Sequence, residues 1–550
     1  MTSPPGRSPA PPDGAAQSNG VAADSVAIAG WTIVSRVTGF ARVAAIAAVL
    51  GPTFFGNLFE TVNLLPNLTH QFLTGALVAA LLVPPLVRAV DLGSLRDQRR
   101  IAGGFLGVLT VVFAVVIFGI VLLGPLVMRL LTIAVRDGDI RDAQLQAGWP
   151  LLAMLTPQAL FYAVADVGVA VQNSRGRFAL AAAAPVVENI GIIAVMGFSA
   201  AIYGLGVAVE DVSTSQLLLV GLGTTAAVGL HAGLQWWGAW RLGVPLYPRP
   251  GWRDPEVRGI VRLAIPSAGF AGLAGVRQLG LIVAAGSIPG GVIALSIGWY
   301  FFNFPVAVGA RPVTVAQLPR LSRAANRGDL TGFHALYQQG LALIMFVAIP
   351  AGFLLMILAR HFARSVAFGE MASDFGVTLA AVSIGTVAAG IVGESLFVAA
   401  TSASYARRNV RAPLIAMAAR VGLTAIGVTL AFVLTEGVAL LAGIGITLAI
   451  ANTISALLLH RSVVADLPPI PPDRRWKRTA DVVASLLAVG AGAIIVWLLP
   501  EFGGPLDRFA GAVIGGLIAV GVYFLLQRMR HSNELTEFAS VFRRGSHVQV

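Results

Sequence analysis

Cysteine is absent from the 550 residues, and lysine occurs once, as Lys477. The missing thiols exclude disulfides and thiolate-bound metal sites. Charged residues make up only 12% of the chain, roughly half of the share found in soluble domains. Because 56% of the residues are apolar and the mean hydropathy is +0.81, the composition predicts a polytopic membrane protein.

Signatures of enzymes and of nucleic-acid binding are also missing. The chain has no phosphate-binding P-loop, and its seven histidines show no metal-ligand spacing. The net charge of +12 is explained by membrane topology, as shown below, rather than by a nucleic-acid partner. We therefore expect a transporter without catalytic residues, metal or resident cofactor, driven by a coupling cation or by the membrane potential.

The amino-terminal segment is rich in proline, glycine and serine. It reads "MTSPPGRSPAPPDGAAQSNG" and predicts a disordered tail over residues 1–23. A cleaved signal peptide would need a basic region followed by an apolar core, and neither is present. The first apolar segment is thus expected to remain as a transmembrane helix.

Segments of about 20 mostly apolar residues are long enough to span a bilayer. Fourteen such segments predict an all-α protein with fourteen transmembrane helices. They cover residues 24–50, 54–87, 103–132, 146–172, 178–203, 215–240, 259–285, 288–318, 333–358, 376–401, 412–435, 438–460, 479–499 and 509–527.

The basic residues are distributed unevenly between the two sides that this count defines. If both termini are cytoplasmic, 27 arginines and lysines lie on the cytoplasmic side and six on the other. Cytoplasmic loops of membrane proteins carry such an excess. One miscounted span would invert every later loop, so the asymmetry supports the count of fourteen.

A weak internal duplication divides the chain. "NLLPNL" and "NFPVAV", "VPPLVRA" and "LPRLSRA", and "QNSRGRFALAAAAP" and "SYARRNVRAP" recur at offsets of 239, 235 and 234 residues. Two parallel lobes of six helices, followed by two further helices, would have this pattern. The predicted units are an N-lobe at 24–241, a C-lobe at 257–465, a helix pair at 475–528 and a cytoplasmic tail at 529–550.

The second span carries a polar stripe. At 100° per residue its polar side chains fall within an arc of about 140°, and Pro66 interrupts the helix. Interhelical hydrogen bonding would explain one or two of them, whereas the full stripe favours a cavity wall. The predicted lining residues are Asn57, Glu60, Asn63, Asn67, His70, Gln71 and Thr74.

Five further arginines, assigned to neither side, remain inside predicted spans, where each costs about 2.5–3.5 kcal/mol at the bilayer centre. Arg311 and Arg420 lie near span ends and are expected to extend to the interface. Arg36 and Arg42 are six residues apart, about 120° on a straight helix, so a bend at Gly39 is needed to aim both at one cavity. Their planar guanidiniums suit a phosphate or pyrophosphate.

Acidic residues within the spans are equally scarce. Each can pair with an arginine, bind a cation or carry a proton, and the sequence leaves these alternatives open. The four candidates for ion coupling are Glu60, Asp166, Glu188 and Glu394.

An ordered series of motifs resembles a known family. The series is "SRVTGFARVAAIAAVLG", "LLPNL…GALVAALLVPPL", "QNSRGRFALAAAAPVVENIG", "FNFPVAV…LPRLSRAANRGD" and "YARRNVRAPL". It resembles the MurJ (MviN) lipid II flippases of the multidrug/oligosaccharidyl-lipid/polysaccharide exporter superfamily, over about residues 24–530. The resemblance implies alternating-access movement of a polyprenyl-linked peptidoglycan precursor across the bacterial cytoplasmic membrane, alongside cell-wall synthesis proteins.

Residue by residue, the resemblance implies a pyrophosphate site at Arg36 and Arg42. His70, or the neighbouring Thr69, falls where the family has another basic residue. Tyr300 stands where the family has a cavity arginine and is expected to line the cavity. Arg277 is a candidate to replace the charge of that arginine.

Three positions depart from the family pattern. Asn57 and Val43 stand where the family usually has acids, and Tyr300 stands where it has an arginine. These departures leave open a flippase for another polyprenyl-pyrophosphate-linked glycan. A drug or metabolite exporter of the superfamily is a further alternative, although the arginines argue against cationic drugs, and a non-transporting scaffold in cell-wall assembly is the last.

The predicted topology can be tested with reporter fusions. Fusions after Arg96 and Arg253 are expected to report a cytoplasmic position, and those after Asp137 and Glu210 an external one. A single reversed reporter would contradict the fourteen-span count.

Overall fold

The computed structural model describes residues 14–73, 77–469, 478–498, 505–530 and 534–535. Within these ranges the chain is built of helices and contains no strand. Each predicted span overlaps one helix or two consecutive helices. Thr74, residues 1–13 and 475–477, and most of the predicted carboxy-terminal tail lie outside the described residues.

The described residues of the first half form nine α-helices and one short 3-10 helix. They are α1 (Gly14–Leu50), α2 (Phe54–Leu73), α3 (Leu77–Asp91), α4 (Leu95–Leu122), α5 (Gly124–Leu131), α6 (Gly138–Leu155), α7 (Gln158–Ser174), α8 (Ala179–Tyr203), η1 (Val209–Asp211) and α9 (Thr214–Arg241).

The second half includes a π-helical turn in one span and a 3-10 turn. Its elements are α10 (Pro255–Ala285), α11 (Gly291–Pro305), η2 (Val306–Ala310), α12 (Arg311–Asn326), α13 (Leu330–Ile357), α14 (Ala359–Val366), η3 (Gly369–Ala372), α15 (Asp374–Ala388), α16 (Ile391–Ala406), α17 (Arg411–Leu434) and α18 (Gly437–Val464). The final pair is α19 (Arg478–Leu498) and α20 (Pro505–Met529).

The helices meet the requirements for a membrane protein with several spans. Among the described residues, nine helices are long and apolar enough to cross a bilayer, and the bent pair α15–α16 makes a tenth. Shorter apolar helices lie at 269–285, 482–494 and 513–529. The fold is thus consistent with fourteen spans.

Helix α1 differs from its prediction at its start. It begins at Gly14, so residues 14–23 are helical rather than part of a disordered tail. Helix α2 continues through Pro66, the residue at which a kink was predicted.

Polar caps define where several of the long apolar helices begin. Ser94, Ser213 and Asp254 each accept a hydrogen bond from a backbone N–H in the first turn of the helix that follows. Such caps satisfy N–H groups that have no partner within the helix. The loops therefore break the apolar runs at defined residues, and each run becomes a separate spanning helix.

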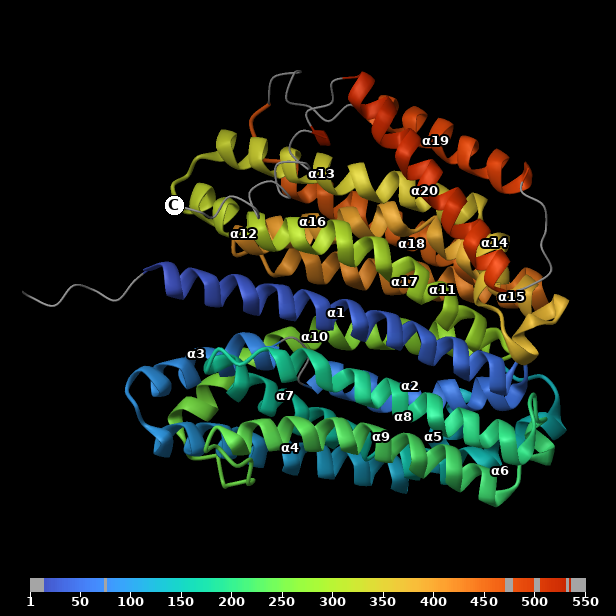
Figure 1. The fold of residues 1–550 in the computed structure, drawn as a ribbon, viewed down its shortest axis with the longest axis horizontal. Coiled ribbons are helices and arrows are strands. Elements are labelled where there is room, and N and C mark those ends of the chain that lie inside the picture. Colours follow the sequence, from blue (N-terminus) through green and yellow to red (C-terminus); the bar gives the residue numbers. More distant parts are fainter. Residues whose placement is uncertain (1–13, 74–76, 470–477, 499–504, 531–533, 536–550) are drawn as a thin grey trace, which may run out of the picture.

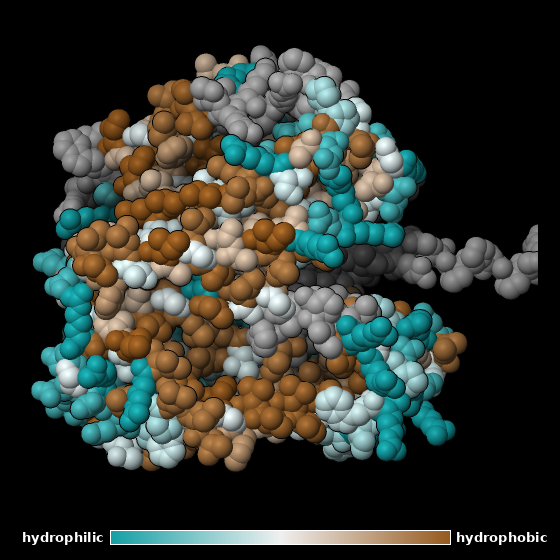
Figure 2. Space-filling model, turned by 180° about the vertical axis from the view of Figure 1, so that it is seen from behind, coloured by the Kyte–Doolittle hydropathy of each residue, from teal (hydrophilic) through white to brown (hydrophobic). Residues whose placement is uncertain are grey.

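The helices form two bundles with α1 and α10 between them (Figure 1). In the first bundle, α1 packs on α8, and α7 packs on α3, α4 and α9. In the second, α18 packs on α15, α16 and α17, while α19 and α20 pack on α13 and α14. The face seen in Figure 2 is largely apolar, with hydrophilic side chains gathered towards the two ends of the bundle. This distribution suits a protein immersed in lipid.

The two bundles are joined at the end where α1 finishes, which we call the closed end. The N–H of Gly290 donates to the carbonyl of Thr53 over 3.2 Å. Nearby, the Asn57 amide donates to the carbonyl of Ile288 over 2.6 Å and accepts from the N–H of Val292 over 2.9 Å. These bonds fasten the start of α2 to the turn between α10 and α11.

Glycine makes this close approach possible. Gly290 has a φ of +71°, and a Cβ built there would lie 2.2 Å from the Pro52 Cα. Real side chains do not tolerate that distance, so a substitution must separate the two bundles or strain the turn.

Gly290→Ala is expected to lower the melting temperature of the purified protein more than Gly328→Ala does. Gly328 has a nearly identical φ of +70° but nothing within 4 Å of its Cβ position, so its substitution costs only backbone strain. Backbone strain at a left-handed residue is about 1–2 kcal/mol. Equal losses for the two variants would show that the Gly290 contact does not hold the closed end together.

Candidate functional site

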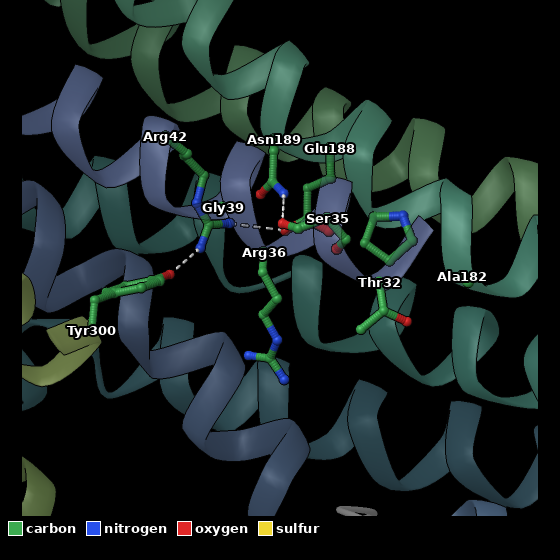
Figure 3. A pocket seen from close by; sticks show the side chains of 10 residues that line it. Thr32, Ser35, Arg36, Gly39, Arg42, Ala182, Glu188, Asn189 and Tyr300 are labelled. Atoms are coloured by element: carbon green, nitrogen blue, oxygen red, sulfur yellow. Dashed lines mark hydrogen bonds and ion pairs between the residues drawn. The ribbon is translucent and has the colours of Figure 1, made fainter. Parts of the chain in front are cut away.

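A cavity of about 320 Å³ lies between the two bundles, beside the middle of α1. Side chains from α1, α8 and α11 line it, as Figure 3 shows. Its walls are polar in part, although the surrounding helices are apolar. The lining residues are Thr32, Ser35, Arg36, Gly39, Arg42, Ala182, Pro185, Glu188, Asn189 and Tyr300.

Arg42 is held between the two bundles by neutral and charged partners. Its Nη1 donates to Glu188 Oε1 over 3.2 Å, and its Nη2 donates to the Tyr300 hydroxyl over 3.1 Å. Its Nε is buried and has no hydrogen-bond partner among the described residues. The predicted cavity position of Arg42 is thus found, and its guanidinium joins α1 to α8 and α11.

Glu188 is the centre of a larger network in the first bundle. The Tyr162 hydroxyl donates to Glu188 Oε1 over 3.0 Å, and His231 Nδ1 lies 2.8 Å from Glu188 Oε2. The carboxylate is buried, and α1, α7 and α9 each bring one partner to it. Glu188 therefore serves as the internal counter-ion of Arg42, the ion-pair alternative that the sequence left open.

Arg36 occupies a different setting on the same helix. Its side chain is exposed, lines the cavity and makes no hydrogen bond or ion pair within the described part of the chain. In Figure 3 its guanidinium extends away from that of Arg42. Arg36 is free to meet a ligand, whereas Arg42 must first exchange a partner.

Gly39 does not interrupt α1. The helix runs unbroken from Gly14 to Leu50, and both arginines reach the cavity because it is elongated along α1. The Asn189 amide lies 3.6 Å from the position of a Gly39 Cβ and donates to Thr38 Oγ1 over 3.1 Å. The small residue therefore permits close packing of α8, and the predicted bend is not needed.

The α2 stripe is divided among helix contacts instead of lining this cavity. Asn57 is 1% exposed and belongs to the closed end, so the prediction that it lines the cavity is wrong. Asn67 donates to the Tyr162 hydroxyl over 3.4 Å. His70 Nε2 lies 2.7 Å from Asp166 Oδ2, which pairs two residues predicted for separate roles in binding and coupling.

The remaining stripe residues have no such partner. Asn63 is partly buried, Gln71 is exposed, and neither lines the cavity. Glu60 is only 9% exposed and makes no hydrogen bond or ion pair among the described residues. The polar arc was correctly located on one helix face, but that face meets α7 and the second bundle.

Arg277 and Glu394 lie elsewhere, in the second bundle. Arg277 Nη1 donates to Asn452 Oδ1 over 2.9 Å, and Arg420 Nη1 donates to Glu394 Oε2 over 2.8 Å. Arg277 therefore does not join Arg42 in a pyrophosphate site. Arg420 is 1% exposed, so the expectation that it extends to the interface is wrong, while Arg311 is exposed.

Four important residues were missed from the sequence. Tyr162, Asn189 and His231 complete the polar network, and Ser35 accepts from the Asn189 amide through its carbonyl over 3.3 Å. The adjacent polar pair Glu188–Asn189 in an otherwise apolar span was a usable signal for Asn189. No spacing rule connects Tyr162 or His231 to it, because they come from other helices.

The site has the chemistry of an anion-binding cavity. Two guanidiniums and one carboxylate line it, so the lining carries a net positive charge. Groups of three or more histidine, aspartate or glutamate residues that could hold a metal are absent among the described residues. A phosphate group in the cavity would meet the N–H donors of Arg42, which is held by its partners, and those of Arg36, which is not.

Comparisons with known proteins agree on one family. The family model described as lipid II flippase MurJ matches residues 46–503. A probable lipid II flippase MurJ from Rhizobium tropici is 24% identical over 521 residues, covering 91% of this chain and 92% of the relative. One from Haemophilus influenzae is 24% identical over 497 residues, covering 86% and 91% of the respective chains.

Solved structures show the same fold. A lipid II flippase MurJ in an inward closed conformation gives a TM-score of 0.70 at 15% identity, covering 92% of this chain and 99% of the other. An inward-facing multidrug resistance MATE family transporter of the MOP superfamily gives 0.60 at 14% identity, covering 79% and 98%. The resemblance predicted from the motifs is confirmed, and the chain belongs to the lipid II flippase MurJ family, a family of transporters built on a multi-pass membrane fold.

Proposed function

We propose that this chain carries lipid II, a glycan linked to a polyprenyl chain through pyrophosphate, from the inner to the outer leaflet of the bacterial cytoplasmic membrane. One observation carries the proposal: within a MurJ-family fold, the cavity between the bundles presents Arg36 and Arg42 to a ligand. Arginines in a spanning region are costly unless they meet a partner. A pyrophosphate is the part of the substrate that supplies one.

Binding would proceed by exchange of partners at Arg42. The pyrophosphate first meets the free guanidinium of Arg36 and then replaces Glu188 on Arg42. Glu188 keeps its bonds to Tyr162 and His231, which stabilise the carboxylate after the exchange. Each charge-assisted hydrogen bond to the ligand contributes about 1.5–3 kcal/mol. The exchange makes binding reversible, because the protein itself offers Arg42 a competing anion.

Alternating access would then require the closed end to separate. The bonds of Gly290 and Asn57 close one end of the bundle, and Arg136 pairs with Glu436 across the same end. With both termini cytoplasmic, the closed end is external, so the substrate enters from the inner leaflet. The energy would come from the membrane potential or a cation, and Glu60, which has no described partner, is a candidate to bind a proton or cation.

A flippase for another polyprenyl-pyrophosphate-linked glycan remains the second candidate. Tyr300 and Val43 favour it, because the first is a neutral residue whose hydroxyl accepts from Arg42 where the family has an arginine, and the second is a buried apolar residue where the family has an acid. The pyrophosphate chemistry is shared, so the two candidates differ only in the glycan. Depleting the protein in its host and identifying the lipid-linked precursor that accumulates on the inner leaflet separates them. Accumulation of no precursor would contradict both.

Arg42→Ala is expected to reduce flipping by about a hundredfold or more, because two charge-assisted bonds to the ligand, each worth about 1.5–3 kcal/mol, are lost. Arg42→Lys keeps the charge without the planar fork and should retain partial activity. Flipping is measured as precursor accessible on the outside of cells or vesicles. Arg311→Ala, a change at an arginine outside the cavity, is the control that should flip normally.

Loss of Arg42 also leaves Glu188 buried without its cation, so misfolding must be distinguished from loss of binding. The double variant Arg42→Gln with Glu188→Gln removes both charges and should restore the melting temperature without restoring flipping. Normal flipping by either well-inserted Arg42 variant would refute the pyrophosphate role.

Glu188→Gln is expected to bind lipid II more tightly than the unmodified protein. The amide keeps the size of the side chain but is a weaker competitor for Arg42 than a carboxylate. The dissociation constant for lipid II in detergent or nanodiscs should fall several-fold, while the control Glu256→Gln at the surface leaves it unchanged. Weaker binding would show that Glu188 orients Arg42 rather than competing with the substrate.

A further inference from the structure

A second cluster of charged side chains lies inside the other bundle, where α10, α16, α17 and α18 meet. Arg277 donates to Asn452 over 2.9 Å. Arg420 donates through Nε to Ser455 over 2.9 Å and through Nη1 to Glu394 over 2.8 Å. Arg277 is 8% exposed, while Arg420 and Asn452 are 1% and 0% exposed. None of these residues lines the cavity beside α1.

This cluster has more hydrogen-bond donors than acceptors. Arg277 Nε, Arg420 Nη2 and Asn452 Nδ2 are buried and have no hydrogen-bond partner in the described part of the chain. Buried polar groups are almost always satisfied, because an unsatisfied donor costs about 1–3 kcal/mol. All three belong to one connected group, since Arg277 contacts Asn452 and Ser455 lies one turn further along α18. A single acceptor could therefore be shared among them.

The cluster also has more positive than negative charge. Two guanidiniums, which stay protonated in proteins, face one carboxylate, that of Glu394. Aromatic rings cover their faces: Arg277 lies 5.8 Å from the Trp299 ring centroid, and Arg420 lies 3.7 Å from that of Phe397. The unsatisfied donors are on the N–H edges of the guanidiniums, where a negatively charged partner would accept from them.

The internal repeat shows how the excess arises. Arg277 follows Arg42 by 235 residues, the same offset as the repeated motifs, and the two lie on the corresponding helices α10 and α1. Glu188 lies on α8, whose counterpart in the second half is α17. Apart from Arg411 at its first position, α17 carries one charged residue, Arg420, 232 residues after Glu188. Where the first bundle has a carboxylate to balance its arginine, the second has another arginine.

We propose that this cluster binds a small inorganic anion, a halide such as chloride, between Arg277, Arg420 and Asn452. The donors are buried among four helices, so a monatomic ion fits the place better than a phosphate or a lipid headgroup. Such an ion neutralises the net charge and accepts from all three donors at once. It acts as a bound counter-ion of the second bundle, independent of the substrate cavity.

The test measures thermal unfolding of the purified full-length protein in sodium chloride, sodium bromide or sodium gluconate at equal ionic strength. We expect the unfolding midpoint to rise with chloride or bromide and to saturate, because a ligand that binds only the folded state stabilises it. Gluconate is too large for the cluster and should produce no saturable rise.

Asn452→Asp is the decisive variant, because it places a carboxylate where the anion would bind. One oxygen keeps the bond to Arg277, and the other replaces the unsatisfied amide donor. The midpoint of this variant should no longer depend on the halide, and in gluconate it should equal or exceed that of the unmodified protein. The control Asn326→Asp adds the same charge at an exposed position and should keep the halide dependence.

Either of two results would overturn the proposal. Equal midpoints in chloride and gluconate for the unmodified protein would show that no halide is bound. A halide dependence that persists in Asn452→Asp would place the ion elsewhere in the molecule. Because the readout is stability, neither result depends on the flippase function.

Discussion

A guanidinium that cannot lose its proton must have a partner when it lies within a bilayer, and this constraint organises the first bundle. Arg42 meets it through Glu188, and Glu188 in turn collects Tyr162 and His231. Four helices, α1, α7, α8 and α9, are connected through one carboxylate. The cavity lies where it does because this pair fixes the side of α1 that faces α8.

The same pair gives the cavity its chemical character. A buried ion pair contributes little net stability, since desolvation offsets much of the attraction between the charges. Because Arg42 and Glu188 both line the cavity, an anionic ligand can instead replace Glu188 as the partner of Arg42. Arg36, exposed and without a described partner, lies six residues earlier on α1 and provides the first contact. The arrangement thus suits an anion that arrives, is held and must leave again.

Movement of that anion depends on the closed end, where neutral hydrogen bonds join the start of α2 to the turn between α10 and α11. There, the backbone at Gly290 packs directly on the backbone at Pro52, and the Asn57 amide donates to the same turn. Short neutral hydrogen bonds of this kind each contribute about 0.5–1.5 kcal/mol, so the contact can be closed firmly and still be broken. The second bundle, with its own arginine cluster, forms the other wall of this closure.

Much of the fold was predictable, because each spanning helix needs its own apolar run of a length that the bilayer sets. The fourteen segments, the arginines beside Gly39 and the family motifs are all local patterns. The polar arc of α2 was also local, but which neighbour that face meets is not. Asn57 therefore proved to join the bundles, and Asn67 and His70 proved to contact α7.

The sequence by itself determined that the chain is helical, that it lies in a membrane and that Arg36 and Arg42 share a helix. Only the tertiary structure decided which acid balances which base. Glu188 is 146 positions from Arg42, and Glu394 is 26 positions from Arg420 on another helix. The periodicity within one helix cannot predict such pairs, because they form between separate helices and depend on how those helices pack.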